Sequence, residues 1–95
     1  MKISNRTRNE IIGSILECAN GSSVTMTEIL YKTYLSHSLL KKYLSFLLER
    51  GLVEYETGRR TFKTTAKGIQ FILAHEQMQK FIVLKTTIPR QGQLK

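Results

Sequence analysis

Residues 35–53 read LSHSLLKKYLSFLLERGLV. Apolar side chains recur in this stretch every three to four residues, which predicts a helix, and this helix decides the fold. Ser36 opens the stretch as a capping residue, and Gly51 closes it. One side of the helix is expected to be buried, because leucines recur there at helical spacing: Leu40, Leu44 and Leu47. The other side carries hydroxyls and ammonium groups about one turn apart, which suits insertion into a DNA groove. We therefore interpret this stretch as a recognition helix.

The candidate groove residues lie on the polar side of this helix. They are His37, Ser38, Leu39, Lys41, Lys42 and Ser45. The lysines can meet guanine acceptors or phosphates, and the hydroxyls can pair with either. Leu39 fits a thymine methyl and the protein core equally well, so both assignments stay open. Because the set contains no arginine, we expect phosphates to supply much of the affinity and sequence preference to be modest.

Two helices are predicted before the recognition helix. Thr25-Met26-Thr27-Glu28 has the form of a capping box and predicts a brief helix with Ile29, Leu30 and Tyr34 as apolar candidates. A short helix, a tight turn and a second polar helix form a helix-turn-helix pattern. The first helix is expected to start near Asn5 and to stop at Asn20-Gly21. Arg6 and Arg8 near its start are either phosphate contacts or solvated side chains.

A small hairpin is predicted after the recognition helix. Val53–Glu56 alternates apolar and acidic residues, as a half-buried strand does, and Thr61–Thr64 can pair back across the turn Thr57–Arg60. Three basic residues lie at or beside this turn, and we expect them to contact the DNA backbone or minor groove: Arg59, Arg60 and Lys63.

A final helix is expected from Ala66 to about Lys85 or Thr86, capped by Thr65 and followed by the helix-ending Pro89. Gly68 suggests close packing near its start, and three residues are expected to pack on the domain: Ile69, Ile72 and Leu73. A second apolar stripe is the expected homodimer interface: Phe71, Ala74, Met78 and Phe81. The alternative is that this stripe folds back on the first helix of its own chain.

The predicted fold class is therefore mainly α with a small β-hairpin, a winged helix-turn-helix followed by a long C-terminal helix. We expect three segments: a DNA-binding domain over 1–65, a dimerisation helix over 66–88 and a flexible basic tail over 89–95. Fifteen basic and seven acidic residues give a net charge of +8, which implies a polyanionic partner such as double-stranded DNA.

Several function classes are poorly supported by the composition. All seven acidic residues are glutamates, and no nucleophile–base pair or glycine-rich phosphate loop occurs, so we expect no enzyme. Cys18, His37 and His75 lack metal-ligand spacing, so we expect no metal and no cofactor. Cys18 is expected to be a half-buried, inert thiol. No apolar run spans a bilayer, and we expect a cytoplasmic, nucleoid-associated protein without a membrane partner.

The run KYLSFLLERGLV over residues 42–53, followed by a hairpin and by TTAKG over residues 64–68, resembles the small archaeal winged-helix DNA-binding proteins. The resemblance covers about residues 6–84. It implies chromatin-associated or regulatory DNA binding, with an antiparallel coiled coil of C-terminal helices as the dimer contact. The short, mixed heptad pattern of this chain departs from a regular coiled coil.

Two rival functions follow from the same sequence. A winged helix can serve as a protein-interaction module whose recognition helix touches no DNA; the paired lysines and the arginine-bearing turn argue against this. A basic amphipathic helix can also lie on a membrane surface. The basic residues of the last helix are too sparse to favour that: Lys67, Lys80 and Lys85.

Overall fold

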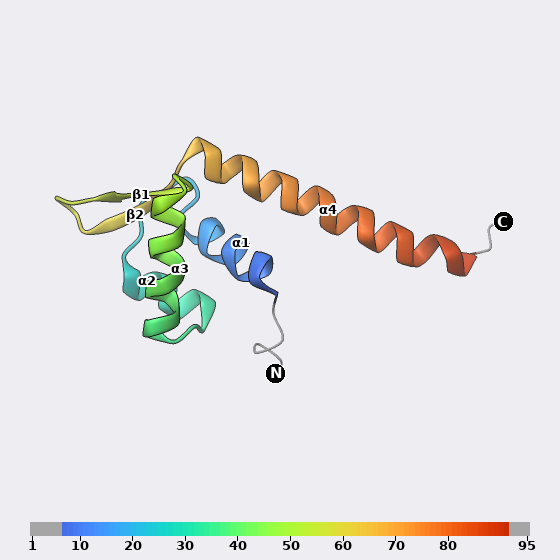
Figure 1. The fold of residues 1–95 in the computed structure, drawn as a ribbon, viewed down its shortest axis with the longest axis horizontal. Helices are drawn as coiled ribbons and strands as arrows, with labels where there is room; N and C mark the ends of the chain where they lie inside the picture. Colours follow the sequence, from blue (N-terminus) through green and yellow to red (C-terminus); the bar gives the residue numbers. More distant parts are fainter. Residues whose placement is uncertain (1–6, 92–95) are drawn as a thin grey trace.

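A computed structural model describes the backbone of residues 7–91 and the side chains of residues 7–78 and Lys80. The elements in chain order are α1 (Arg8–Cys18), α2 (Met26–Thr33), α3 (His37–Glu49), β1 (Val53–Glu56), β2 (Thr61–Thr64) and α4 (Ala66–Gln91). The first three helices and the hairpin form a body from which α4 projects (Figure 1). The predicted class, mainly helical with a small antiparallel hairpin, is confirmed.

The caps of α2 and α3 form as the sequence predicts. Thr25 Oγ1 accepts a hydrogen bond from the Glu28 amide at 3.2 Å, and the Glu28 carboxylate accepts one from the Thr25 amide at 2.8 Å. At the start of α3, Ser36 Oγ accepts from the Leu39 amide at 3.2 Å. These bonds satisfy amides that have no partner within the helix, and so they fix where each helix begins.

The predicted start of the first helix is wrong. The cap is Thr7, whose hydroxyl accepts from the Glu10 amide at 3.1 Å while the Glu10 carboxylate accepts from the Thr7 amide at 3.0 Å. This reciprocal pair satisfies two free amides, whereas a lone asparagine cap satisfies one. Asn5 and Arg6 lie outside the described residues.

The turn between α2 and α3 corrects a second expectation. Tyr34 was expected to contribute to the apolar side of α2, but its side chain is 73% exposed. The reason is its backbone: α2 ends at Thr33, and Tyr34 adopts a left-handed conformation with φ of 61°. That conformation turns the chain towards α3 and carries the tyrosine ring away from the core.

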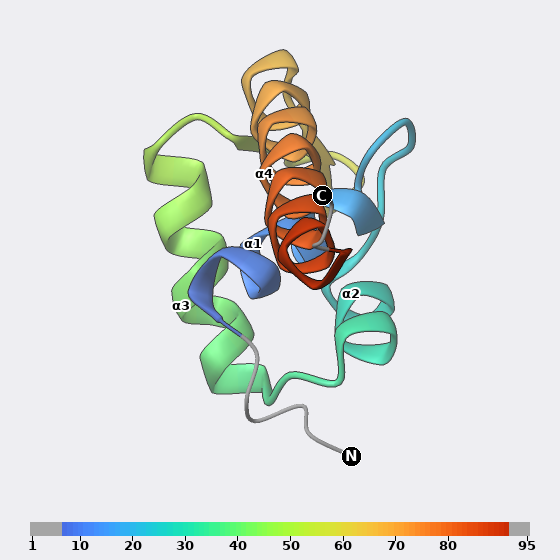
Figure 2. The same cartoon turned by 90° about the vertical axis from the view of Figure 1, so that its right-hand side faces the viewer.

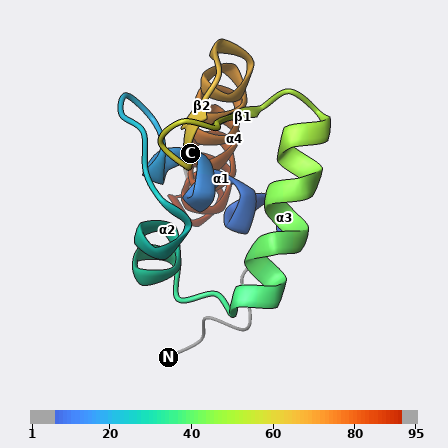
Figure 3. The same cartoon turned by 90° about the vertical axis from the view of Figure 1, so that its left-hand side faces the viewer.

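The hairpin is braced by the segment that precedes α2. β1 and β2 pair in the register Val53↔Thr64 to Glu56↔Thr61. Val24 adds a bridge on the other edge of β2, because its amide donates to the Phe62 carbonyl at 2.9 Å and its carbonyl accepts from the Phe62 amide at 2.7 Å. The hairpin and α3 lie at the same end of the body, with α1 between α2 and α3 (Figure 3). The bridge therefore fixes the hairpin relative to the helices.

The core lies where the three helices and the hairpin meet. Its fully buried side chains come from all three helices: Ile15, Leu16, Ile29, Leu40 and Leu47. Each such side chain contributes about 1.5–3 kcal/mol by burial. Thr64 is buried with them, and its hydroxyl donates to the Leu16 carbonyl at 2.7 Å, so the end of β2 is tied to α1.

The first turns of α4 pack on the body. Gly68 lies so close to β1 and β2 that a Cβ there would collide with the Leu52 carbonyl oxygen and the Thr64 methyl, which confirms the predicted close packing. Ile72 is buried, and α4 runs beside α1 (Figure 2). Two of the three residues expected to pack on the domain do not: Ile69 is 37% exposed and Leu73 is 56% exposed. Ile72, one turn from Ile69, is the member of this group that α1 covers.

The described helix α4 ends at Gln91, beyond the predicted end near Lys85 or Thr86 and beyond Pro89. A proline removes the amide that would bond to the carbonyl four residues earlier, so near a helix end it costs one backbone bond without dividing the helix in two. Residues 92–95, the last part of the predicted tail, lie outside the described residues.

Candidate nucleic-acid interface

All six groove candidates of α3 have exposed side chains: His37, Ser38, Leu39, Lys41, Lys42 and Ser45. Leu40, Leu44 and Leu47 hold the opposite side of the helix in the core. Leu39, for which two assignments stood open, is 37% exposed and is not part of the core. The polar and cationic side of α3 is thus presented to solvent by the leucines beneath it.

The outermost row of α3 contains one residue that was not predicted. At 3.6 residues per turn, Ser38, Lys42, Ser45 and Glu49 fall within one narrow stripe along the helix. All four side chains are exposed. The row is therefore cationic towards its start and acidic at its end, so a polyanion is attracted most strongly to the N-terminal half of α3.

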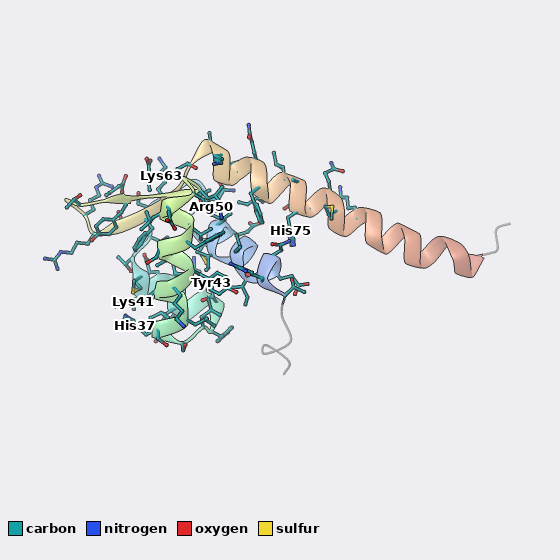
Figure 4. All side chains as sticks on the ribbon, in the orientation of Figure 1. His37, Lys41, Tyr43, Arg50, Lys63 and His75 are labelled. Carbon is teal, nitrogen blue, oxygen red and sulfur yellow. The ribbon has the colours of Figure 1, made fainter. Side chains whose placement is uncertain are left out.

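One flank of α3 faces the hairpin. Leu48, Tyr55 and Arg60 line a shared hollow of about 440 Å³, together with Met26 and Phe62. The three basic candidates of the hairpin are all exposed: Arg59, Arg60 and Lys63. Figure 4 shows Lys63 on the hairpin, beside the end of α3, and Lys41 at the other end of that helix. Arg60 thus lies beside α3, whereas Lys63 follows the buried Phe62 and lies on the other face of the hairpin.

The other flank of α3 faces the start of α1. Arg8, Lys42 and Tyr43 line a hollow of about 270 Å³ there, with Leu39 and Phe46. Leu48 and Phe46 are two residues apart, which is about 200° around a helix, so the hairpin and Arg8 lie on opposite flanks of α3. Arg8 thus lies beside the groove candidates Leu39 and Lys42. Two further basic residues near this flank, Arg50 and Lys67, are described below.

Two titratable groups are shifted by their surroundings. Hydrogen bonds from the Ser23 and Thr61 hydroxyls lower the pKa of Glu56, at the hairpin turn, below its ordinary value. Burial raises the pKa of the Cys18 thiol, so the thiol stays protonated at neutral pH. Cys18 is half-buried, as predicted, and a protonated thiol is a poor nucleophile.

The predicted dimer residues divide into two groups. Phe71 is half-buried against the core and stacks on His75, with 6.1 Å between ring centroids. Ala74 and Met78 are exposed, Met78 by 61%. The side chain of Phe81 lies outside the described residues. The exposed part of the stripe therefore begins at Ala74, in a turn of α4 that still lies beside α1.

Two further features of the described residues bear on function. Nowhere among them do three or more His, Cys or Glu side chains come together as metal ligands. None of their helices has the length and apolarity needed to cross a bilayer.

Comparison with known proteins identifies the architecture. Residues 5–83 match a family model described as winged helix-turn-helix. The structure is similar to the crystal structure of Sso10a-2, a DNA-binding protein from Sulfolobus solfataricus, with a TM-score of 0.73 and 19% sequence identity. The alignment covers 95% of this chain and 100% of that chain, and at this identity the similarity concerns the fold. A search of curated protein sequences found no match.

Proposed function

The chain belongs to the winged helix-turn-helix family, and on that premise we propose that it binds double-stranded DNA. In this proposal α3 lies in the major groove, and the basic hairpin contacts the backbone or the minor groove. The observation that carries it is the exposed, leucine-backed polar side of α3, bordered by the hairpin with Arg59 and Arg60. The fold neighbour from Sulfolobus, itself a DNA-binding protein, supports the same function.

Electrostatics supports phosphate contact as the main source of affinity. The chain carries a net charge of +8, and lysines act as point charges that discriminate bases less well than arginines. If each protomer neutralises about four or five phosphates, the log affinity of a dimer falls with log salt at a slope of roughly −7 to −9. We propose a role in transcription regulation or chromatin organisation, in the cytoplasm at the nucleoid, without enzymatic activity.

We propose that the functional unit is a homodimer joined through α4. The stripe of Phe71, Ala74, Met78 and Phe81 follows α4, and its described members Ala74 and Met78 are exposed. An exposed apolar stripe on a helix that projects from its domain is stabilised when a second copy covers it. Two recognition helices carried by one dimer would also double the number of phosphate contacts.

The test is a titration of a fluorescent duplex of about two helical turns with the full chain, at several salt concentrations. We expect Lys41→Ala/Lys42→Ala to weaken binding and to flatten the salt dependence, because each lysine lost removes about one unit of slope per protomer. Lys80→Ala is the matched control, because Lys80 is an exposed lysine on α4, remote from α3. Circular dichroism checks that each variant remains folded.

The rival function is a protein-interaction module, and it makes the opposite prediction. Tyr31 and Tyr34 at the end of α2 are 82% and 73% exposed, and exposed tyrosines are common in protein interfaces. Unchanged DNA binding by the folded Lys41→Ala/Lys42→Ala variant, or a salt slope near zero for the wild type, would support this rival and contradict the proposed function.

A further inference from the structure

Three basic residues beyond the groove and hairpin candidates gather on the flank of α3 that faces away from the hairpin. They are Arg8 at the start of α1, Arg50 at the end of α3 and Lys67 in the first turn of α4, and we call them the Arg8 cluster. They come from three separate elements, so the fold and not the local sequence brings them together. All three side chains are exposed.

A single aromatic ring orients the two arginines. The Arg50 guanidinium lies 4.8 Å from the centroid of the Phe46 ring, and the Arg8 guanidinium lies 5.4 Å from the same centroid. Cation–π attraction holds each guanidinium over the ring at the expense of other rotamers. The planar edges of both groups keep their N–H donors available, and those edges match the oxygens of a phosphate.

Lys67 is held in place by a backbone contact. Its Nζ donates a hydrogen bond to the Arg50 carbonyl oxygen at 2.8 Å, which satisfies a free carbonyl at the C-terminal end of α3. An ammonium group has two further N–H donors, so this bond leaves Lys67 able to bind an anion.

The cluster borders a hollow of about 540 Å³ whose floor is apolar. The floor is formed by Ile12, Phe46, Leu52 and Phe71, and Asn9 adds an amide to the rim. Among the described residues that line this hollow, three are cationic and none is acidic. All the charged residues around this hollow therefore attract an anion.

We infer that the Arg8 cluster is a second phosphate-binding row, which contacts the DNA strand on the side of α3 opposite the hairpin. The inference rests on the proposed function and extends it. The major groove is about 12 Å wide and has a phosphate backbone along each edge, so a helix seated in it has one strand on each flank. The hairpin arginines serve one flank of α3, and the Arg8 cluster serves the other.

Phosphate-specific mapping of the full chain on a duplex tests this inference. Ethylation of individual phosphates in the DNA should interfere with wild-type binding on both strands. Because the proposed dimer exchanges the two strands between its half-sites, we expect Arg8→Ala/Arg50→Ala to lose the interference on one strand of each half-site. Arg59→Ala/Arg60→Ala should lose it on the other strand of the same half-site. Each arginine removed should weaken binding about tenfold at 0.1 M salt and flatten the salt slope by about one per protomer.

Two controls make the outcomes distinct. Lys80→Ala removes one positive charge from α4 and should leave the interference pattern unchanged, while Phe46→Leu keeps every charge but removes the ring that orients the arginines. We expect Phe46→Leu to weaken binding while the salt slope keeps its wild-type value. If the wild type binds with a steep salt slope and Arg8→Ala/Arg50→Ala keeps the interference on both strands within each half-site, the inference of a second phosphate-binding row is wrong and the proposed function stands. If the wild type shows no salt-dependent binding, the proposed function itself fails.

Discussion

Glu56 Oε1 accepts a hydrogen bond from Ser23 Oγ at 2.6 Å, so a residue at the hairpin turn is joined to a loop that precedes it by 33 positions. The same carboxylate oxygen accepts from Thr61 Oγ1 at 2.7 Å. Together with the Val24–Phe62 bridge, these bonds make the hairpin and the preceding loop one unit. A carboxylate that accepts two hydroxyl bonds is stabilised in its charged form.

The first prediction concerns acid stability. The pKa of Glu56 is lower in the folded chain than in the unfolded chain, so the folded state binds fewer protons. Its contribution to stability is present above the ordinary glutamate pKa, about 4.3, and is lost as pH falls through the lowered folded-state value. We expect Glu56→Gln to lower the free energy of unfolding at neutral pH. The further decrease of that free energy below pH 4 should be smaller in the variant than in the wild type, as measured by urea unfolding across pH. The control is Glu54→Gln, an exposed glutamate on the same strand; equal effects of the two variants would contradict this account.

The second prediction separates stability from binding at the hairpin turn. Arg60 has a left-handed backbone with φ of 57°, which is costly for any residue with a Cβ. Arg60→Gly should therefore stabilise the fold by about 0.5–1 kcal/mol while lowering DNA affinity about tenfold at 0.1 M salt. Arg59→Gly removes the same charge without relieving a positive φ, so it should weaken binding without stabilising. Thermal melting and the duplex titration give the two readouts, and a stability loss in Arg60→Gly would oppose the first half of this prediction.

The third prediction concerns the turn of the helix-turn-helix. Tyr34 combines a left-handed backbone with an exposed ring, so Tyr34→Gly relieves strain and gives up little packing. We expect a gain of about 0.5–1 kcal/mol in the free energy of unfolding. Tyr31→Gly is the control, because Tyr31 is equally exposed but lies within α2, where glycine costs about 1 kcal/mol. A loss of stability in both variants would show that the Tyr34 ring contributes more than its exposure suggests.

The fourth prediction concerns the junction of α4 with the body. Gly68→Ala places a methyl group against the Leu52 carbonyl and the Thr64 side chain, and it should cost about 1–3 kcal/mol. Gly58→Ala, in the hairpin turn, has open space for its methyl and should be close to neutral. Urea unfolding of both variants compares them directly. If Gly68→Ala left the free energy of unfolding unchanged, α4 would be able to shift away from Leu52 and Thr64 at no cost in stability.

The fifth prediction tests the proposed dimer. Met78→Lys places a charge in the exposed part of the α4 stripe, so we expect it to convert the dimer to a monomer in solution. Leu73→Lys changes an equally exposed side chain on another side of α4 and should leave the dimer intact. Sedimentation equilibrium distinguishes the two, and a monomeric wild type would refute the proposed assembly.

Much of the fold could be predicted because its signals are local. The Thr25–Glu28 box and the Ser36 cap each lie within a few residues, and each forms as expected. β1 forms where its sequence pattern predicts a strand, but its burial does not alternate, because Tyr55 is 44% exposed. The start of α1 was missed although Thr7 and Glu10 form the same kind of box. Asn5 fits a cap by residue type alone, whereas the three-residue spacing of Thr7 and Glu10 indicates a reciprocal pair, which satisfies one amide more.

The candidate site could be predicted only in part. The polar side of α3 follows from helical periodicity, so the exposure of Lys42 and Ser45 could be predicted, and their contact with DNA stays a prediction. The gathering of Arg8, Arg50 and Lys67 could not be predicted, because Arg8 and Lys67 are 59 positions apart and only the packing of α1 and α4 beside α3 brings them to one flank. The exposure of Ile69 and Leu73 could not be predicted either, because the sequence does not say which side of α4 meets α1.

The bracing of the hairpin by Ser23 and Val24 has one last consequence. Ser23 bonds to Glu56 and Val24 bonds to Phe62, so the hairpin is fixed to the body on both of its strands. The distance between the hairpin turn and α3 is therefore constant. An A-form RNA duplex has a deep, narrow major groove that a helix cannot enter, whatever its charge. We therefore expect this chain to prefer B-form DNA over RNA duplexes of equal length.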